Sequence, residues 1–165
     1  MKTIDIIGDN YCGQWKKSRT ACRAVVIRDG DLLLSYETKT DTWMLPGGGV
    51  EPGESDAACC VREVCEETGS VVLPGECFLE IDEYYEDRKW VNRYFVCTVA
   101  GEGERHLTEP EIAAGMEPRW IPVTQAVTIF GTHADYAATD EERRGMHQRE
   151  YIALCEWCEI EKTNP

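Results

Sequence analysis

The sequence has no apolar run long enough to cross a bilayer. Its apolar segments, such as residues 24–27 and 32–34, are short, whereas a membrane-spanning helix needs about 20 apolar residues. The first residues, Met1 to Asp5, also lack the pattern of a signal peptide. We therefore expect a cytoplasmic protein with no membrane partner.

Basic runs are missing as well. The chain has 17 Lys and Arg against 31 Asp and Glu, a formal net charge of −14. Such a charge repels nucleic-acid backbones, so we expect no binding to duplex nucleic acid. A small polyphosphate ligand stays compatible with this charge if divalent cations bridge carboxylates and phosphate oxygens. A bound metal is therefore expected.

The nine cysteines do not form a recognisable disulfide or zinc framework. Their number is odd, and the one metal-like spacing, Cys155-x-x-Cys158, has no second pair. Tyr151, Leu154, Cys155 and Cys158 instead follow the spacing of one buried helix face. We expect reduced thiols, mostly buried, and no structural zinc.

Length and composition favour one compact domain over residues 1–165, with 42% hydrophobic and 29% charged side chains. Apolar and β-branched residues on both sides of a turn signal predict a hairpin of residues 21–27 and 32–34 around Asp29-Gly30. They also predict strands at 71–81 and 90–99 and a short edge strand at 120–123. A capping box at Thr139 and Glu142 predicts a last helix to about residue 161. We expect a mixed sheet covered by helices, an α/β (α+β) fold.

A glycine- and proline-rich segment, residues 45–53, leads into a predicted helix at residues 56–68. The segment is a poor helix or strand and is expected to be a shaped loop. Ser55 can cap the start of the helix, and Gly69 can adopt the left-handed conformation after its end. The apolar positions expected to face the core are Ala57, Val61, Val64, Cys65 and Thr68.

Glu63, Glu66 and Glu67 share another sector of this helix, with Arg62 one turn before Glu66. Like charges at this spacing disfavour a helix by roughly a few tenths of a kcal/mol per pair. A solvated acidic face is the plain alternative. The adjoining glycine loop favours phosphate chemistry, because Mg²⁺ is typically shared between carboxylates and substrate phosphates.

Two other phosphate-binding loops fail on this sequence. Gly48 and Gly53 have the glycine spacing of a P-loop, but Glu54 stands where a lysine is needed. Gly47-x-Gly49 is followed by Pro52 instead of the third glycine of a dinucleotide-binding fingerprint.

The loop and helix resemble the Nudix box. Gly48 is followed after five residues by Glu54, and seven residues later by Arg62-Glu-Val-Cys-Glu-Glu-Thr-Gly69. Only Ser70 departs from the motif, where an aliphatic residue is usual. The resemblance implies the Nudix-type α/β/α sandwich with a mixed β-sheet.

The resemblance also implies a metal site and a set of supporting residues. In the family, glutamates at the positions of Glu63, Glu66 and Glu67 bind Mg²⁺, with Mn²⁺ as the alternative, and the backbone carbonyl at Gly47 often joins them. Arg62 is expected to orient glutamates. Glu54 is expected to hold the loop against the helix.

The general base is left open by the resemblance. It is a glutamate of the box, Glu63 or Glu67, or a glutamate of a later loop, for which Glu109 and Glu111 are the candidates. An ordinary acidic turn near Pro110 is the plain alternative for the last two.

The implied reaction is hydrolysis of the diphosphate linkage in a nucleoside diphosphate joined to another group, X. ADP-ribose, nucleotide sugars and modified nucleoside triphosphates are candidate substrates. Arg23, Trp43 and Gly48 are the expected substrate contacts. Other aromatic and basic residues are candidates for stacking or phosphate binding, although core or solvated positions are favoured for them: Tyr84, Tyr85, Trp90, Tyr94, Arg19, Lys89 and Arg93.

The runner-up is a catalytically silent Nudix-fold module that binds a nucleotide or regulates, although no catalytic residue of the box is lost. An isomerase of the isopentenyl diphosphate type is disfavoured because it needs a catalytic cysteine and a histidine-containing metal site. The three histidines, His106, His133 and His147, have no partner at motif spacing and are expected at the surface. A homodimer is the expected assembly.

Overall fold

A computed structural model describes residues 1–163. Eight strands are connected in the order β1-β6-β7-β2-β3-β4, with β5 added to β2 and β8 to β3. β1 runs parallel to β6, and β2 runs parallel to β7, whereas the other pairs are antiparallel. The strands are β1 (Lys2–Ile7), β2 (Lys17–Arg28), β3 (Asp31–Glu37), β4 (Thr42–Met44), β5 (Gly47–Gly49), β6 (Ser70–Tyr85), β7 (Arg88–Glu102) and β8 (Met116–Pro122).

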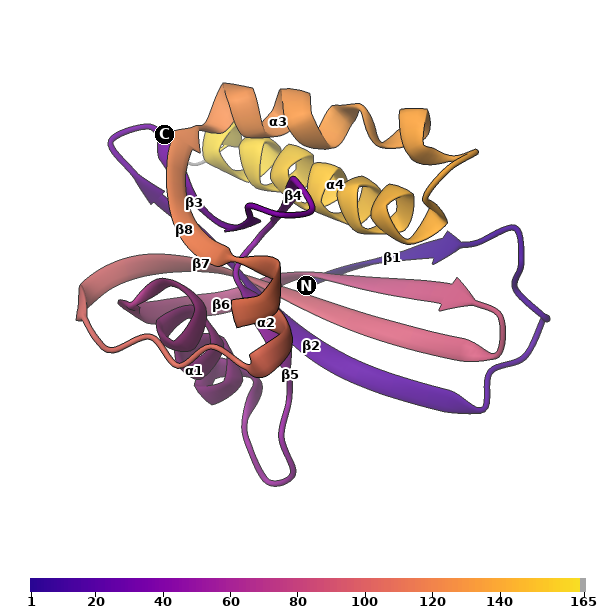
Figure 1. Cartoon of the computed structure of the whole chain (residues 1–165), viewed down its shortest axis with the longest axis horizontal. Helices are drawn as coiled ribbons and strands as arrows, with labels where there is room; N and C mark the ends of the chain where they lie inside the picture. The colour runs from indigo at the N-terminus through magenta and orange to yellow at the C-terminus, as the bar shows by residue number, and fades with distance from the viewer. Residues whose placement is uncertain (164–165) are drawn as a thin grey trace.

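Helices cover both sides of the strands (Figure 1). α1 lies on one side, and α3 and α4 pack against each other on the opposite side. The α/β/α sandwich with a mixed sheet that the sequence predicted is confirmed. The helices are α1 (Asp56–Thr68), α2 (Glu109–Ala114), α3 (Val123–Gly131), the 3₁₀ helix η1 (His133–Tyr136) and α4 (Glu141–Thr163).

The predicted hairpin is present and joins β2 to β3. Ile27 pairs with Leu32 and Arg28 with Asp31. The two turn residues between them, Asp29 and Gly30, have φ angles of 52° and 85°. Two consecutive positive φ angles are what a two-residue hairpin with the usual strand twist requires.

Each helical layer has its own apolar core, and β2 contributes to both. Cys22, Ala24 and Val26 pack in a cluster with α1, while Val25 packs in a second cluster with α3 and α4. Successive side chains of a strand point to opposite faces, so both faces of β2 are buried. Arg23 lies on the α4 side of the strand, among apolar neighbours.

α1 has the predicted ends but a different buried face. Ser55 accepts a hydrogen bond from the Ala58 amide at 3.2 Å, and Gly69 ends the helix with φ 75°. Of the five positions predicted to face the core, Val64 and Thr68 are buried and Val61 and Cys65 are half-buried, whereas the prediction is wrong at Ala57, which is exposed. The buried face comprises Cys59, Cys60, Val64, Glu67 and Thr68. It is rotated towards Glu67 because that carboxylate has polar partners inside the fold.

Three other expectations are corrected. Gly47–Gly49 is a strand because these residues pair with β2. The last helix is capped by Asp140, whose Oδ1 accepts from the Arg143 amide at 3.0 Å, so the capping box at Thr139 is wrong. His147 is 1% exposed, and its ring packs against Phe130 and Tyr136.

The predicted edge strand exists as β8, which is longer than expected and pairs with β3. All nine cysteines are free thiols; Cys12 is exposed, four are buried, and four are half-buried, including Cys155 and Cys158. Within residues 1–163, no helix is both long and apolar enough to cross a membrane.

Candidate active site

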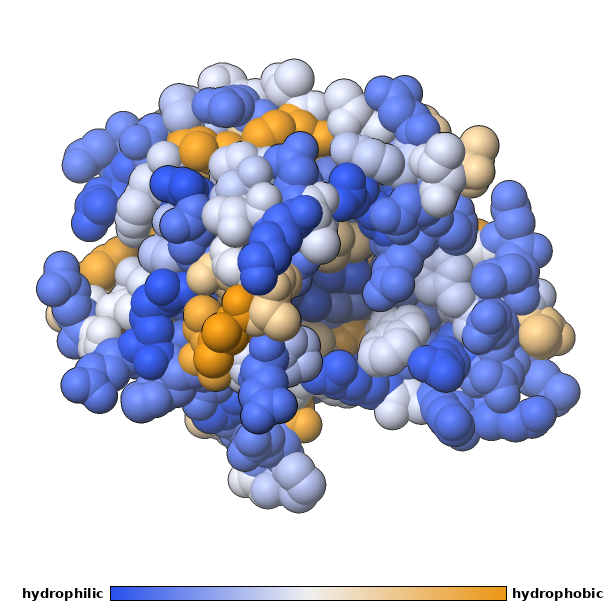
Figure 2. Space-filling model, viewed as in Figure 1, coloured by the Kyte–Doolittle hydropathy of each residue, from blue (hydrophilic) through white to orange (hydrophobic). Residues whose placement is uncertain are grey.

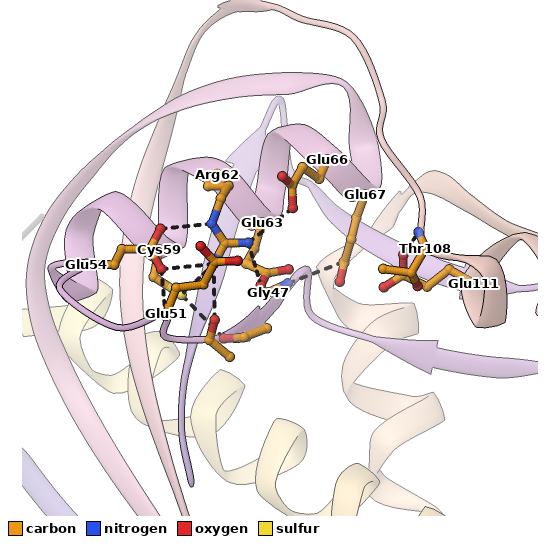
Figure 3. A network of polar contacts seen from close by, with 12 residues as sticks. Gly47, Glu51, Glu54, Cys59, Arg62, Glu63, Glu66, Glu67, Thr108 and Glu111 are labelled. Carbon is orange, nitrogen blue, oxygen red and sulfur yellow. Dashed lines mark hydrogen bonds and ion pairs between the residues drawn. The ribbon is translucent and has the colours of Figure 1, made fainter.

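Arg62 lies at the centre of a polar network on α1 (Figure 3). Its guanidinium binds both oxygens of Glu54, at 2.8 and 2.9 Å. It also donates to Glu63 at 2.9 Å and to Glu66 at 3.1 Å. A fifth hydrogen bond, 3.1 Å long, reaches the carbonyl of Gly49. One side chain therefore joins the helix, the preceding loop and β5.

The carboxyl groups of the network have pKa values shifted in opposite directions. The hydrogen bonds from Arg62 lower the pKa of Glu54 to about 2. The pKa of Glu63 is raised instead, chiefly because burial disfavours its charged form, despite its bond to Arg62. Glu54 is therefore held as a carboxylate that joins the loop to Arg62 of α1.

Glu67 is buried, unlike its two neighbours on the helix. Its carboxylate accepts hydrogen bonds from the Ser35 hydroxyl at 2.5 Å and from the Gly47 amide at 3.3 Å. Burial raises the pKa of Glu67 to about 8; Arg23 opposes this rise and Glu63 adds to it. The carboxylates thus lie along one edge of α1, with Glu67 innermost and facing β5 (Figure 3).

Glycines let β5 approach both α1 and β2. A Cβ atom on Gly48 would lie 2.5 Å from the carboxylate of Glu63. One on Gly47, where φ is 147°, would lie 2.0 Å from the carbonyl oxygen of Cys22. No other residue fits either place without moving the backbone or the glutamate. This close packing explains why a glycine-rich segment forms a strand here.

The side chains around Gly47 fit a hard divalent cation. The available donors are carboxylate and carbonyl oxygens, which Mg²⁺ and Mn²⁺ prefer. The raised pKa values of Glu63 and Glu67 show that negative charge is disfavoured at this edge, and a cation would relieve it. No group of three or more His, Cys, Asp or Glu side chains in residues 1–163 is already arranged around one metal position. Arg62 binds both Glu63 and Glu66 instead.

A later loop packs on the C-terminal end of α1. Arg105 donates to the Glu67 carbonyl at 2.8 Å and to the Met116 carbonyl at 2.6 Å. The loop continues to α2, where Glu111 accepts from the Thr108 amide at 2.7 Å. The charge of Glu111 contributes to the raised pKa of Glu63, so the two are within electrostatic reach. Glu109 is an exposed residue at the start of α2.

A cleft of about 580 Å³ begins at β5 and runs between α4 and the sheet. Figure 2 shows the surface hollowed between α4 and the strands. Alternate residues of β2, β6 and β7 form its floor, as expected for one face of a sheet. Its lining comprises Asn10, Arg19, Ala21, Arg23, Gly48, Gly49, Glu83, Tyr85, Glu86, Arg88, Trp90, Val91, Asn92, Glu141, Glu142, Met146 and Arg149.

Arg23 connects this cleft to the glycine strand. Its Nη1 donates to the Leu45 carbonyl at 3.3 Å and to the Gly47 carbonyl at 3.1 Å. Its Nε lies 3.9 Å from Glu150, which is fully buried. Arg149 in turn pairs with Glu150 at 3.4 Å and with Glu83 at 3.1 Å. A series of ion pairs and hydrogen bonds therefore connects α4 to the backbone beside Glu67.

The structure brings most of the predicted residues together. The box glutamates and Arg62 meet at one edge of β5, and Arg23 and Gly48 line the cleft at its other edge. Trp43 is not among the described cleft residues, and its ring lies 4.1 Å from that of Tyr36.

Sequence reasoning missed the buried charges of α4. Arg149 and Glu150 lie one turn before the buried residues Ala153 and Leu154. Charged residues at helical spacing from an apolar pair were the available signal, because a charge on a buried face needs a partner.

The chain is similar in sequence to a known family and to several of its members. The NUDIX domain model matches residues 17–142. Diphosphoinositol polyphosphate phosphohydrolase 3-alpha of Mus musculus is 34% identical over 119 residues, which cover 71% of this chain and 71% of the relative. Diphosphoinositol polyphosphate phosphohydrolase 2 of Rattus norvegicus is 34% identical over 129 residues, covering 77% and 70%.

Solved structures show the same fold at lower identity. A NUDIX hydrolase from Nitrosomonas europaea has a TM-score of 0.59 and 23% identity, over 82% of this chain and 88% of that chain. A UDP-X diphosphatase has a TM-score of 0.54 and 19% identity, over 67% and 53%. From the family match and the relatives, the chain belongs to the Nudix hydrolase family.

Proposed function

We propose that the protein hydrolyses the diphosphate linkage of a nucleoside diphosphate joined to another group, X, with the help of a divalent metal ion. One observation carries the proposal. β5 is contacted on one side by Glu63 and Glu67 and on the other by Arg23 of the cleft. A diphosphate lying along Gly47–Gly49 would therefore meet carboxylates suited to a cation and an arginine suited to phosphate.

The metal would be held by Glu63, Glu66 and Glu67 with the carbonyl of Gly47, and Mg²⁺ or Mn²⁺ suits these oxygens. When bound, such an ion neutralises phosphate charge and activates water. The protein's own part is to hold these groups in place. Arg62 fixes Glu63 and Glu66, and Ser35 fixes Glu67.

The proton of the attacking water would be accepted by one of the nearby glutamates. Glu63 and Glu67 are the candidates on α1, because both lie beside the glycine strand Gly47–Gly49. Glu111 is the candidate of the later loop, because its charge reaches Glu63. We assign Glu109 no such role, since it is exposed at the start of α2.

The cleft suits a nucleotide better than a ring bearing many phosphates. Its described lining has four arginines and four glutamates, so its formal charge is balanced. Arg23 and Arg149 are already paired with buried glutamates. Trp90 supplies aromatic surface for a base. Substrate contacts would come from Arg23 and Gly48, whereas Trp43 would contribute only if the adjoining β4 region moved.

A second candidate substrate is a diphosphoinositol polyphosphate. It is favoured by the relatives named above, which are 34% identical to this chain. It would need several cations for its phosphates.

The test is release of products from ADP-ribose, nucleotide sugars, dinucleoside polyphosphates, nucleoside triphosphates and a diphosphoinositol polyphosphate. Each is incubated with Mg²⁺, with Mn²⁺ and with chelator. We expect metal-dependent cleavage of a nucleotide. Preference for the inositol compound would establish the second candidate, and folded protein that cleaves none would support a nucleotide-binding or regulatory module.

We also propose that the chain is a single domain and that the protein acts in the cytoplasm as a homodimer. Sedimentation would measure the assembly, and fractionation would measure the compartment.

A further inference from the structure

Two glycines from opposite ends of the chain enclose the ring of Tyr85. Gly8 follows β1, and its amide donates to the Tyr84 carbonyl at 2.8 Å. A Cβ atom on Gly8 would lie 2.2 Å from the ring of Tyr85, and one on Gly145 would lie 2.3 Å from its hydroxyl. No side chain fits at either position while the ring stays where it is.

Gly145 is unfavourable for the helix that contains it. It lies within α4 (Glu141–Thr163), and glycine is a poorer helix former than alanine. The close approach of Tyr85 explains its presence. Both Gly8 and Gly145 lie outside residues 17–142, the part of the chain matched by the family model. The enclosure of Tyr85 is therefore built by segments beyond that match.

The space that Gly8 and Gly145 leave around the Tyr85 ring is called the slot here. It holds the ring in position without help from hydrogen bonding. The Tyr85 hydroxyl is buried and has no hydrogen-bond partner within residues 1–163. Burial raises the pKa of Tyr85 to about 12, so the hydroxyl is neutral at physiological pH. The position of the ring thus depends on the space that the two glycines leave.

Tyr85 lines the cleft at the end remote from β5 and the carboxylates of α1. It pairs with Arg88 on β7, and Arg88 pairs with Lys17 on β2. Lys17 lies six residues before Arg23, which corresponds to roughly 20 Å of strand. The cleft thus extends from Gly48 to Tyr85, a span suited to an extended nucleotide.

We propose that Tyr85 closes this end of the cleft and limits the size of the substrate group that fits there, with Gly8 and Gly145 setting its position. The inference rests on the proposed function, because it assumes that the cleft holds the substrate. Tyr85 is then a specificity-determining residue. Gly8 and Gly145 are positioning residues that act through it.

The slot itself is tested by melting temperatures. Gly145→Ala should lower the melting temperature of the wild type, although alanine favours a helix. In a Tyr85→Ala background the same change should raise it, because the clash is gone. Gly131→Ala is the matched control, since its Cβ would meet Tyr151 at an ordinary 3.4 Å. A rise for Gly145→Ala in both backgrounds would overturn the slot.

Substrate selection is tested by the ratio of two dissociation constants, for ADP-ribose and for ADP. Tyr85→Ala should shift this ratio by about tenfold in favour of the bulkier ADP-ribose, the effect of a small change in an apolar pocket. Gly145→Ala should shift it the other way, because its methyl group displaces the hydroxyl end while Gly8 blocks the ring at Cδ1 and Cε1, so that the ring moves into the cleft. Unchanged ratios in both variants, or no binding of either probe to the wild type, would overturn the proposal.

Binding of the two probes is measured separately from hydrolysis, so the role of Tyr85 and the proposed hydrolysis can fail independently. Wild-type protein that binds both probes but hydrolyses no substrate would defeat the proposed hydrolysis. The ratios for the two variants would still decide the role of Tyr85.

Discussion

The two edges of β5 differ in how they are built. On the α1 side, Arg62 joins Glu54, Glu63 and Glu66, all from one short stretch of chain, by hydrogen bonds of 2.8 to 3.1 Å. On the α4 side, the cleft is assembled from the N-terminal region, three strands and the last helix. The first edge is a local motif, and the second is a meeting of distant segments.

We propose that this difference separates the reaction, on the α1 side, from substrate recognition, on the α4 side. The geometry of a motif that is local in the sequence depends little on distant segments. The cleft, in contrast, depends on segments such as those of Gly8 and Gly145, which lie outside the family match. We therefore expect changes beside α1 to reduce kcat, and changes beside α4 to alter KM, substrate choice or stability.

The largest effect is expected from Glu66→Gln. The change keeps the shape of the side chain but removes a carboxylate proposed to bind metal, so kcat should fall by about 10³-fold. Steady-state kinetics with Mg²⁺ measure this, and circular dichroism should show a folded protein. Glu76→Gln, at an exposed position of β6, is the control. Unchanged turnover would remove Glu66 from the mechanism.

Arg62→Lys should reduce kcat by about 10²-fold, since a lysine cannot hold both oxygens of Glu54 and reach Glu63 and Glu66 as well. Because Arg62 is proposed to act by orientation, KM should change much less than kcat. Arg119→Lys, on the exposed edge of β8, provides the matched comparison. A large rise in KM with kcat intact would contradict the separation of the two edges.

Burial of His147 predicts a pH-dependent loss of stability on the α4 side. Its pKa is lowered from 6.5 to about 4, chiefly by burial. Between these values the unfolded chain binds more protons than the folded one, so the unfolding free energy should fall as pH decreases. The loss is about 3 kcal/mol for this lowering of the pKa from 6.5 to about 4, measured by denaturant unfolding at several pH values. His147→Phe should reduce it, and exposed His106→Gln should not. Equal pH profiles for wild type and His147→Phe would refute the prediction.

The smallest effect is expected from Arg23→Lys, which keeps the charge near Glu150 but loses the paired hydrogen bonds to Leu45 and Gly47. KM should rise about tenfold with kcat within about twofold, corresponding to about 1.4 kcal/mol of lost binding. Exposed Arg28→Lys is the control. A fall in kcat as large as that of Arg62→Lys would place Arg23 with the α1 edge.

The sequence determined the features that depend on local spacing. The β2–β3 turn, the ends of α1 and the grouping of Arg62 with Glu54 and Glu66 all follow from residues close together along the chain. Helical and turn geometry fixes such relations before any tertiary contact forms.

Tertiary structure decided what depends on partners far along the chain. Glu67 is buried because Ser35 and Gly47 meet it there, and a helical wheel treats it like Glu66. The sequence pattern places His147 at the surface and leaves the burial of Glu150 unpredicted, because burial of a polar side chain is set by the segments that cover it. The same holds for Tyr85: its place in the cleft wall depends on Gly8 and Gly145, at opposite ends of the chain, which are brought to the Cδ1–Cε1 edge and the hydroxyl end of one ring.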